Sequence, residues 1–173
     1  MLQENSTIAT FAGSVTMADK YFALYPYQVT ASVNGTNLSV NLPAVQQYAV
    51  QSFGQNAMPM VAKVESGEEL YFKNLCGGFI LNITGTEVIK TIQFTGYDDS
   101  GNRMKVAGDY LVDMSYSDAP ALVGTGSSNT SVTLNCGDGV QLSENAATSF
   151  HLVLPLKYGI FRRSYFSPWL VLF

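Results

Sequence analysis

Apolar and polar residues alternate along several short runs of this chain. In residues 29–33 and again in residues 38–42 an apolar side chain occupies every second position, and the dipeptide Asn34-Gly35 lies between the two runs. A period of two is typical of strands with one buried face, and Asn-Gly favours a two-residue hairpin turn. The pattern therefore predicts a β-hairpin over residues 29–42.

A second block with the same pattern spans residues 70–85. Residues 70–72 and 79–83 alternate, and residues 74–78 separate them with the pair Gly77-Gly78. A glycine pair inside such a pattern predicts a bulge or corner between two strands. Further strands are predicted at residues 60–64, 88–94, 103–106, 110–114, 132–136 and 150–154. Many short strands without a long helix predict an all-β sandwich or barrel.

Two interpretations of residues 43–53 stay open. Val45, Tyr48 and Phe53 are spaced as on one face of a helix, and a proline precedes them at a position that suits a first helical turn. The same segment also fits an irregular crossing over the edge of a sandwich.

Composition supports a single β-rich domain and excludes one class of partner. A chain of 173 residues is enough for one domain that buries about two-thirds of its unfolded surface. Only 13% of the residues are charged and 47% are hydrophobic, a profile that suits sheets better than helices. The net charge of -4 argues against a nucleic-acid partner, because phosphates require a basic surface.

Residues that carry catalytic chemistry are few, so we expect neither an enzyme nor a cofactor. His151 is the only histidine and lies within a predicted strand, which favours an outward-facing strand residue over a catalytic base. The segments Gly124-Thr-Gly126 and Gly137-Asp-Gly139 lack the further residues of a nucleotide-binding loop and are interpreted as turns.

One segment has part of the spacing of a calcium loop. Asp98, Ser100, Asn102 and Asp109 stand at ligand positions of such a loop, but Arg103 replaces the glycine that its sharp bend needs. A hairpin turn built on Asp99-Ser-Gly-Asn102 is the favoured interpretation, and no metal site is predicted.

The two cysteines allow two interpretations. Cys76 and Cys136 each end a predicted strand and are each followed by glycine. A disulfide between them would close a long loop and contribute roughly 4 kcal/mol on the loop-entropy estimate. The alternative is two buried thiols that pack as small apolar residues.

The order of several short motifs resembles the amino-terminal domain of fimbrillin-family surface proteins of Bacteroides-type bacteria. The resemblance covers roughly Ala9 to Pro155, and its motifs are Tyr25-Pro26-Tyr27, Leu42-Pro43-Ala44, Pro59-Met-Val-Ala62, Phe72-Lys-Asn-Leu-Cys-Gly77, Val132-Thr-Leu134 and Val153-Leu-Pro155. It implies a transthyretin-like or Greek-key β-sandwich over residues 1–155 that is incomplete at its N-terminal edge. Residues 156–173 are then an apolar tail, either out of frame or an added strand.

The resemblance also implies a role. Fimbrillins are non-catalytic outer-membrane lipoproteins at the cell surface, where they build adhesive fimbriae by exchanging strands with other fimbrial subunits and contact host or bacterial surface ligands. The candidate groove for an exchanged strand is lined by inward apolar residues, and the same residues also suit an ordinary core: Phe79, Leu81, Ile83, Ile92 and Phe94. The alternative is a surface glycan-binding β-sandwich module that stacks sugars on a row of tyrosines: Tyr97, Tyr110, Tyr116 and Tyr158.

The chain departs from the family pattern at both ends. Residues 1–6 show neither the basic start nor the apolar core of an export signal nor a lipid-anchor cysteine, and the resemblance would require both signals upstream. The apolar run in residues 169–173 is far shorter than the ~20 residues that span a bilayer, so no transmembrane segment is predicted. Because Arg162-Arg163 and Pro168 interrupt alternation, a truncated or frame-shifted tail is favoured over a donor strand.

Overall fold

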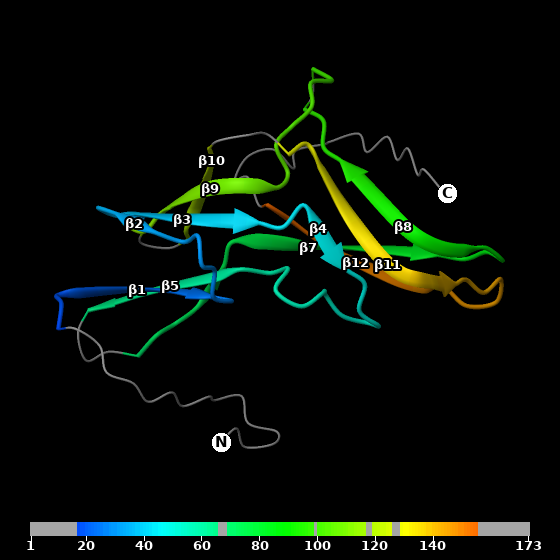
Figure 1. Ribbon diagram of the computed structural model, residues 1–173, viewed down its shortest axis with the longest axis horizontal. Coiled ribbons are helices and arrows are strands. Elements are labelled where there is room, and N and C mark those ends of the chain that lie inside the picture. Colours follow the sequence, from blue (N-terminus) through cyan, green and yellow to red (C-terminus); the bar gives the residue numbers. More distant parts are fainter. Residues whose placement is uncertain (1–16, 66–68, 99, 117–118, 126–128, 156–173) are drawn as a thin grey trace.

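Figure 1 shows the computed structural model, which describes residues 17–65, 69–98, 100–116, 119–125 and 129–155. These residues form strands joined by turns, and they contain no helix. The strands are β1 Lys20–Tyr25, β2 Val33–Asn34, β3 Asn37–Leu42, β4 Val45–Gln47, β5 Met60–Glu65, β6 Lys73–Asn74, β7 Cys76–Ile83, β8 Val88–Thr95, β9 Gly108–Asp113, β10 Ala121–Gly124, β11 Ser131–Gln141 and β12 Thr148–Pro155. The all-β prediction is therefore confirmed for the described residues.

The strands form four small sheets that combine into a β-sandwich-like fold. Their orders are β1-β5-β6, β12-β7, β10-β9-β3-β2 and β4-β11-β8. Only Leu75 separates β6 from β7, and only Pro43-Ala44 separates β3 from β4, so each of these runs passes from one sheet into the next. Figure 1 shows β1, β5 and β7 below β2, β3 and β9. Every pairing is antiparallel except that of β4 with β11.

Apolar side chains from facing sheets form two core clusters. The first includes Val40 of β3, Val61 of β5 and Tyr110 of β9. The second joins β8 and β11 to β7 and β12, and its fully buried members include Leu134 and Phe150. Burying a large apolar side chain contributes about 1.5–3 kcal/mol, so these two clusters are the main source of stability.

The predicted hairpin is confirmed, but its two-residue turn is Gly35-Thr36 instead of Asn34-Gly35, and its first arm is shorter than expected. Asn34 pairs with Asn37 across Gly35, whose φ of 60° is the left-handed conformation that this turn requires. Only Val33–Asn34 form the first strand, while residues 29–30 lie in a turn. Further along, the side-chain amide of Gln28 bonds to both backbone groups of Asn41, at 2.9 and 2.8 Å, where a longer arm would have paired.

The predicted corner lies at Leu75, between β6 and β7, and the glycine pair that was expected to form it lies inside strand β7 instead. Strand β7 runs without a break from Cys76 to Ile83 and pairs with β12 along its whole length. A Cβ built on Gly78 would lie 2.3 Å from Cζ of Phe53. The glycine is needed because an aromatic ring packs directly on the backbone there. Residues 70–72, predicted as strand, are irregular and exposed.

Residues 43–53 form no helix, and they are not wholly irregular either, because part of the segment is a strand. Val45–Gln47 form β4, which pairs in parallel with residues 133–135 of β11. The chain then turns at residues 50–51, where Gln51 has a φ of 53°. Helical spacing was misleading because Gln46, not the apolar residues beside it, is the side chain that this segment buries completely.

Other strand predictions are confirmed in β5, β8, β9, β11 and β12, and one is wrong. Residues 103–106 lie outside any strand, after a turn at residues 98–102. The segment Gly137-Asp-Gly139 is not a turn between strands but an irregularity within β11, between Asn135 and Val140. Strands β1, β4 and β10 were not predicted. The expectations for the N-terminal edge before residue 17 and for the tail at 156–173 lie outside the described residues.

Candidate functional site

Strands β7 and β8 each end a sheet in the described part of the chain. β7 pairs with β12 on one side, and β8 pairs with β11 on one side. The two strands belong to different sheets, and residues 84–87 connect them directly. Side chains of both strands belong to the second core cluster. We call the outer edges of these two strands, Cys76–Ile83 and Val88–Thr95, the β7–β8 edge.

The five residues predicted to line a strand-exchange groove all lie at the β7–β8 edge. They share one core cluster, in which Ile92 is buried and the other four are partly buried: Phe79, Leu81, Ile83 and Phe94. The rings of Phe79 and Phe94 contact each other with centroids 5.8 Å apart. Residues from two different strands, placed together by the fold, thus form one apolar strip.

Exposure increases from β12 toward β7 in this cluster, whereas Ile89 and Ile92 of β8 stay buried, at 2% and 3% exposed. Phe150 and Leu152 of β12, which lie deeper, are 0% and 1% exposed, whereas Phe79 and Leu81 on neighbouring β7 are only partly buried. A strand edge offers backbone donors and acceptors, and a partly exposed apolar strip offers a surface for side chains. The arrangement is therefore suited to adding an extended segment.

Away from the β7–β8 edge, Gln46 of β4 connects the sheet that contains β11 to β12 of the other sheet. Its Nε2 donates to the carbonyl of Val153 at 2.8 Å, and the N–H of Val153 donates to its Oε1 at 2.9 Å. Gln46 is 3% exposed and is the only fully buried polar side chain among the described residues. Sequence analysis missed it because the polar pair Gln46-Gln47 contains no signal of burial.

The structure describes Cys76 and Cys136 as free thiols. Both are buried, but Cys76 belongs to the first core cluster and Cys136 to the second. Burial raises the pKa of Cys76 to about 12 and also raises the pKa of Cys136. Since the thiolate is the reactive form, neither residue is suited to nucleophilic chemistry near neutral pH. Of the two interpretations, the structure shows the one with two buried thiols.

His151 lies on β12 opposite Ile80, and Phe53 covers it. The ring centroids of His151 and Phe53 are 5.2 Å apart in an edge-to-face arrangement, and Nδ1 of the histidine is buried without a hydrogen-bond partner. A triad requires the base to be oriented by a further polar group. The geometry around His151 therefore suits packing against Phe53, on the face of β12 that also carries Val153 of the first core cluster.

The calcium-like segment forms a hairpin turn, as the favoured interpretation predicted. One carboxylate oxygen of Asp98 accepts the backbone N–H groups of Ser100 and Asn102, at 2.9 and 2.8 Å. The hydrogen bonds from Asn102 are the main reason that the pKa of Asp98 is lowered. Asp109 instead accepts a hydrogen bond from Asn41 at 2.7 Å. Across the described ranges, no cluster of three or more His, Cys, Asp or Glu residues is placed to hold a metal ion.

The three described tyrosines of the predicted sugar-binding row do not form an exposed row. Tyr110 is fully buried and donates to the carbonyl of Lys105 at 3.0 Å. Tyr116 is partly buried under Nζ of Lys63, 4.5 Å from its ring centroid. Tyr97 is exposed, and the predicted site at Tyr158 lies outside the described residues.

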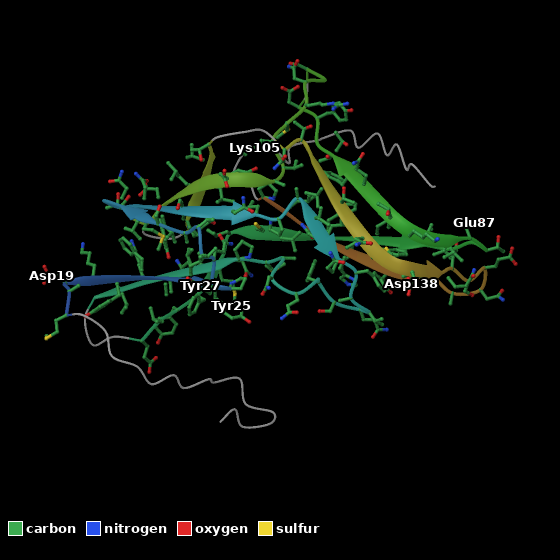
Figure 2. All side chains as sticks on the ribbon, in the orientation of Figure 1. Asp19, Tyr25, Tyr27, Glu87, Lys105 and Asp138 are labelled. Atoms are coloured by element: carbon green, nitrogen blue, oxygen red, sulfur yellow. The ribbon has the colours of Figure 1, made fainter. Side chains whose placement is uncertain are left out.

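The most exposed tyrosines lie elsewhere. Tyr25 and Tyr27 are 58% and 85% exposed and lie close together near the end of β1 (Figure 2). Tyr71, whose hydroxyl donates to Glu69 at 2.7 Å, precedes β6. The register of β1, β5 and β6 aligns Leu24 with Lys73, which places Tyr71 toward the other end of β1 from Tyr27. These aromatic residues therefore form two separate exposed groups.

No helix in the described part of the chain is long and apolar enough to cross a membrane. A scan against protein-family models and searches of curated proteins and of solved structures returned no match. The function is therefore inferred from the chain's own residues and their geometry.

Proposed function

We propose that this protein is a non-catalytic structural and adhesive subunit of a fimbrillin-type surface fibre, joined to other subunits by strand exchange. The proposal includes a transthyretin-like, Greek-key topology and a location at the outer membrane as a lipoprotein. Its support is the order of the sequence motifs, together with an all-β fold whose candidate groove residues lie side by side at the β7–β8 edge.

The observation that carries the proposal is the incomplete burial of the apolar strip at two adjacent strand edges. An incoming strand would gain about 0.5–1.5 kcal/mol for each backbone hydrogen bond. It would also cover the exposed parts of Phe79, Leu81, Ile83 and Phe94, at about 25 cal/mol for each Å² of apolar surface removed from water. A few such contacts together are enough to offset the entropy of ordering an extended segment.

The test replaces one apolar residue of the strip by lysine. Ile83→Lys adds a charge at the end of β7, where the strand ladder itself is least disturbed, and an ammonium group resists burial under an added strand. Val123→Lys is the matched control, because Val123 is 57% exposed on β10, which ends a different sheet.

Association is measured by light scattering after size-exclusion chromatography over a range of protein concentrations. The unchanged protein is expected to associate, Ile83→Lys to weaken association at least about tenfold, and Val123→Lys to leave it unchanged, since burying an unpaired charge costs more than 1.4 kcal/mol. A far-UV circular dichroism spectrum confirms that each variant is folded. Equal weakening by both variants, or an unchanged protein that stays monomeric throughout, would argue against strand exchange at this edge.

The exposure of Tyr25 and Tyr27 favours a second candidate function, the binding of surface glycans. Flat aromatic faces open to solvent can stack against the apolar faces of sugar rings. Titration with a panel of soluble oligosaccharides, followed by calorimetry, tests this role. Tyr27→Ala is expected to abolish any binding and Tyr71→Ala, in the other exposed group, to leave it intact. Binding that survives Tyr27→Ala would contradict a site at this position.

A further inference from the structure

We propose that Gln46 locks the side of the sandwich between β4 and β12, and so confines strand addition to the β7–β8 edge. This inference rests on the proposed function, because it specifies which edge a partner strand uses. It concerns the one buried polar side chain of the described core, which no other part of the structure explains.

The lock consists of one side-chain amide that stands in for a peptide group. In an antiparallel ladder, a residue exchanges one N–H and one C=O hydrogen bond with its neighbour. The amide of Gln46 makes this same pair with Val153, donating to its carbonyl at 2.8 Å and accepting from its N–H at 2.9 Å. The outer edge of β12 is thus satisfied at Val153 without a neighbouring backbone.

The backbone of Gln46 is held in the other sheet. It lies opposite Leu134 of β11, and hydrogen bonds on either side fix the segment: Thr133 donates to Ala44 at 2.8 Å, and Tyr48 donates to Asn135 at 2.9 Å. Gln46 therefore connects β11 in one sheet to β12 in the other. A strand that approached β12 from this side would have to displace β4 as well as break both bonds to the amide.

The ring of Tyr48 adds to this closure. It packs against Phe150 of β12 with centroids 5.4 Å apart, just beyond the position of Gln46 in the chain. Backbone pairing, one amide and one aromatic contact thus hold β4 against both sheets. On one side of the second core cluster, β4 and β12 are thus joined by hydrogen bonds and an aromatic contact. The β7–β8 edge belongs to the same cluster.

A second glutamine uses its amide in the same way, which supports a role in closing edges. Gln28 donates to the carbonyl of Asn41 at 2.9 Å and accepts from its N–H at 2.8 Å. Asn41 lies on β3, on a stretch of its outer edge that β2 does not reach. In both places a glutamine satisfies the peptide groups that would otherwise attract another strand.

The experiment follows amide hydrogen exchange in the full chain at low and high protein concentration. Gln46→Leu removes both hydrogen bonds, and Gln46→Glu retains the acceptor but loses the donor. Gln47→Leu and Gln47→Glu are the matched controls, because Gln47 is the exposed neighbour on the same strand. The Val153 amide reports the lock, and amides of residues 88–95 report addition at β8.

With the lock in place, self-association is expected to slow exchange in residues 88–95 but not in residues 148–155. Of the two Gln46 variants, Gln46→Leu is expected to speed exchange of the Val153 amide about tenfold, which is the effect of losing one hydrogen bond worth about 1.4 kcal/mol, whereas Gln46→Glu keeps the acceptor of this amide and is expected to speed it less. They are also expected to make residues 148–155 a second site of protection on association, whereas the Gln47 variants behave as the unchanged protein.

Other outcomes separate the two ideas. If the unchanged protein associates through residues 148–155, or if folded Gln46→Leu leaves the Val153 amide as slow as before, the lock is refuted and strand exchange stands. If the unchanged protein does not associate at all, strand exchange is refuted, while a faster Val153 amide in the variants still supports the lock. Should both Gln46 variants fail to fold, the unchanged protein alone decides between the two edges.

Discussion

Replacing Gly78 by alanine is expected to destabilise the protein through a single aromatic ring. A Cβ at this position would lie 2.3 Å from Cζ and 2.9 Å from Cε1 of Phe53, while ordinary contacts of a Cβ begin at 3.4 Å. Gly78 is not among the glycines with positive φ, so its backbone conformation accepts alanine without strain. The whole effect of the substitution should therefore come from the clash with Phe53.

The size of the effect follows from what the ring loses when it moves. Overpacking a core costs about 1–3 kcal/mol, and the lower half of this range, about 1–2 kcal/mol, applies where the obstructing atoms belong to the far end of one side chain. Moving the ring also disrupts the edge-to-face contact with His151, at 5.2 Å between centroids. The destabilisation by Gly78→Ala cannot exceed the cost of deleting the Phe53 ring altogether. Deleting a fully buried phenylalanine ring costs roughly 3–5 kcal/mol, and for the partly buried Phe53 the limit is about 2 kcal/mol.

The sign of the effect should change when Phe53 is removed first. In a Phe53→Ala background the clash is absent, and Gly78→Ala is expected to stabilise by about 0.4–1 kcal/mol, because alanine loses less backbone entropy than glycine on folding. The coupling between the two positions is then about 1.5–3 kcal/mol. Urea unfolding of all four proteins, followed by circular dichroism, measures it. An equal cost of Gly78→Ala in both backgrounds would refute the idea that the glycine makes room for the ring.

The other predictions concern two amides, two thiols and one turn. Gln46→Leu is expected to lower the free energy of unfolding by about 2–4 kcal/mol, because it leaves buried backbone groups of β12 unpaired. Gln28→Leu is expected to lower it by less than about 1 kcal/mol, because water replaces the amide at an exposed edge. Similar urea midpoints for the two variants would contradict this difference. Cys76 and Cys136 are expected to react with a thiol reagent at pH 8 only after unfolding, and rapid labelling of the folded protein would contradict their burial. Since the folded pKa of Cys76, about 12, lies above its ordinary value of 9.0, its contribution to stability is complete below pH 9 and is lost as pH rises toward 12, which denaturant titrations can follow. The lowered pKa of Asp98 has the opposite sign: its contribution is present above pH 3.8 and is lost as pH falls below that value. The protection of the Ser100 and Asn102 amides, taken relative to the intrinsic exchange rate at each pH, should therefore fall in acid, and unchanged protection would contradict the role of the carboxylate.

Local pattern was enough to predict most of the strands. Alternation identified residues 60–64, 88–94 and 132–136, and Asn34-Gly35 identified a turn, because a strand buried on one face and a turn with positive φ each impose their requirement on a few neighbouring residues. Alternation also showed which side chains of β7 and β8 would point inward. It did not show that Phe79 and Phe94 would contact each other, since that depends on how two sheets stack.

Predictions failed where a residue's partner lies far away in the chain. Gly78 was interpreted as a break in a strand, but a ring 25 positions earlier explains it. The spacing of residues 43–53 suited a helix, but the partner that decides their conformation is β11. Gln46 had no signal at all, because the backbone groups it bonds are 107 residues further along.

The sequence by itself determined the all-β character, the positions of the main strands and the apolar residues that make up the core, because these depend on periodicity and on local turn chemistry. The tertiary structure alone decided which strand edges meet, which side of the sandwich Gln46 closes, and that the two cysteines lie in different clusters. The physical reason is that packing and hydrogen bonding between distant segments are chosen by the fit of whole sheets, and no short stretch of sequence contains that information.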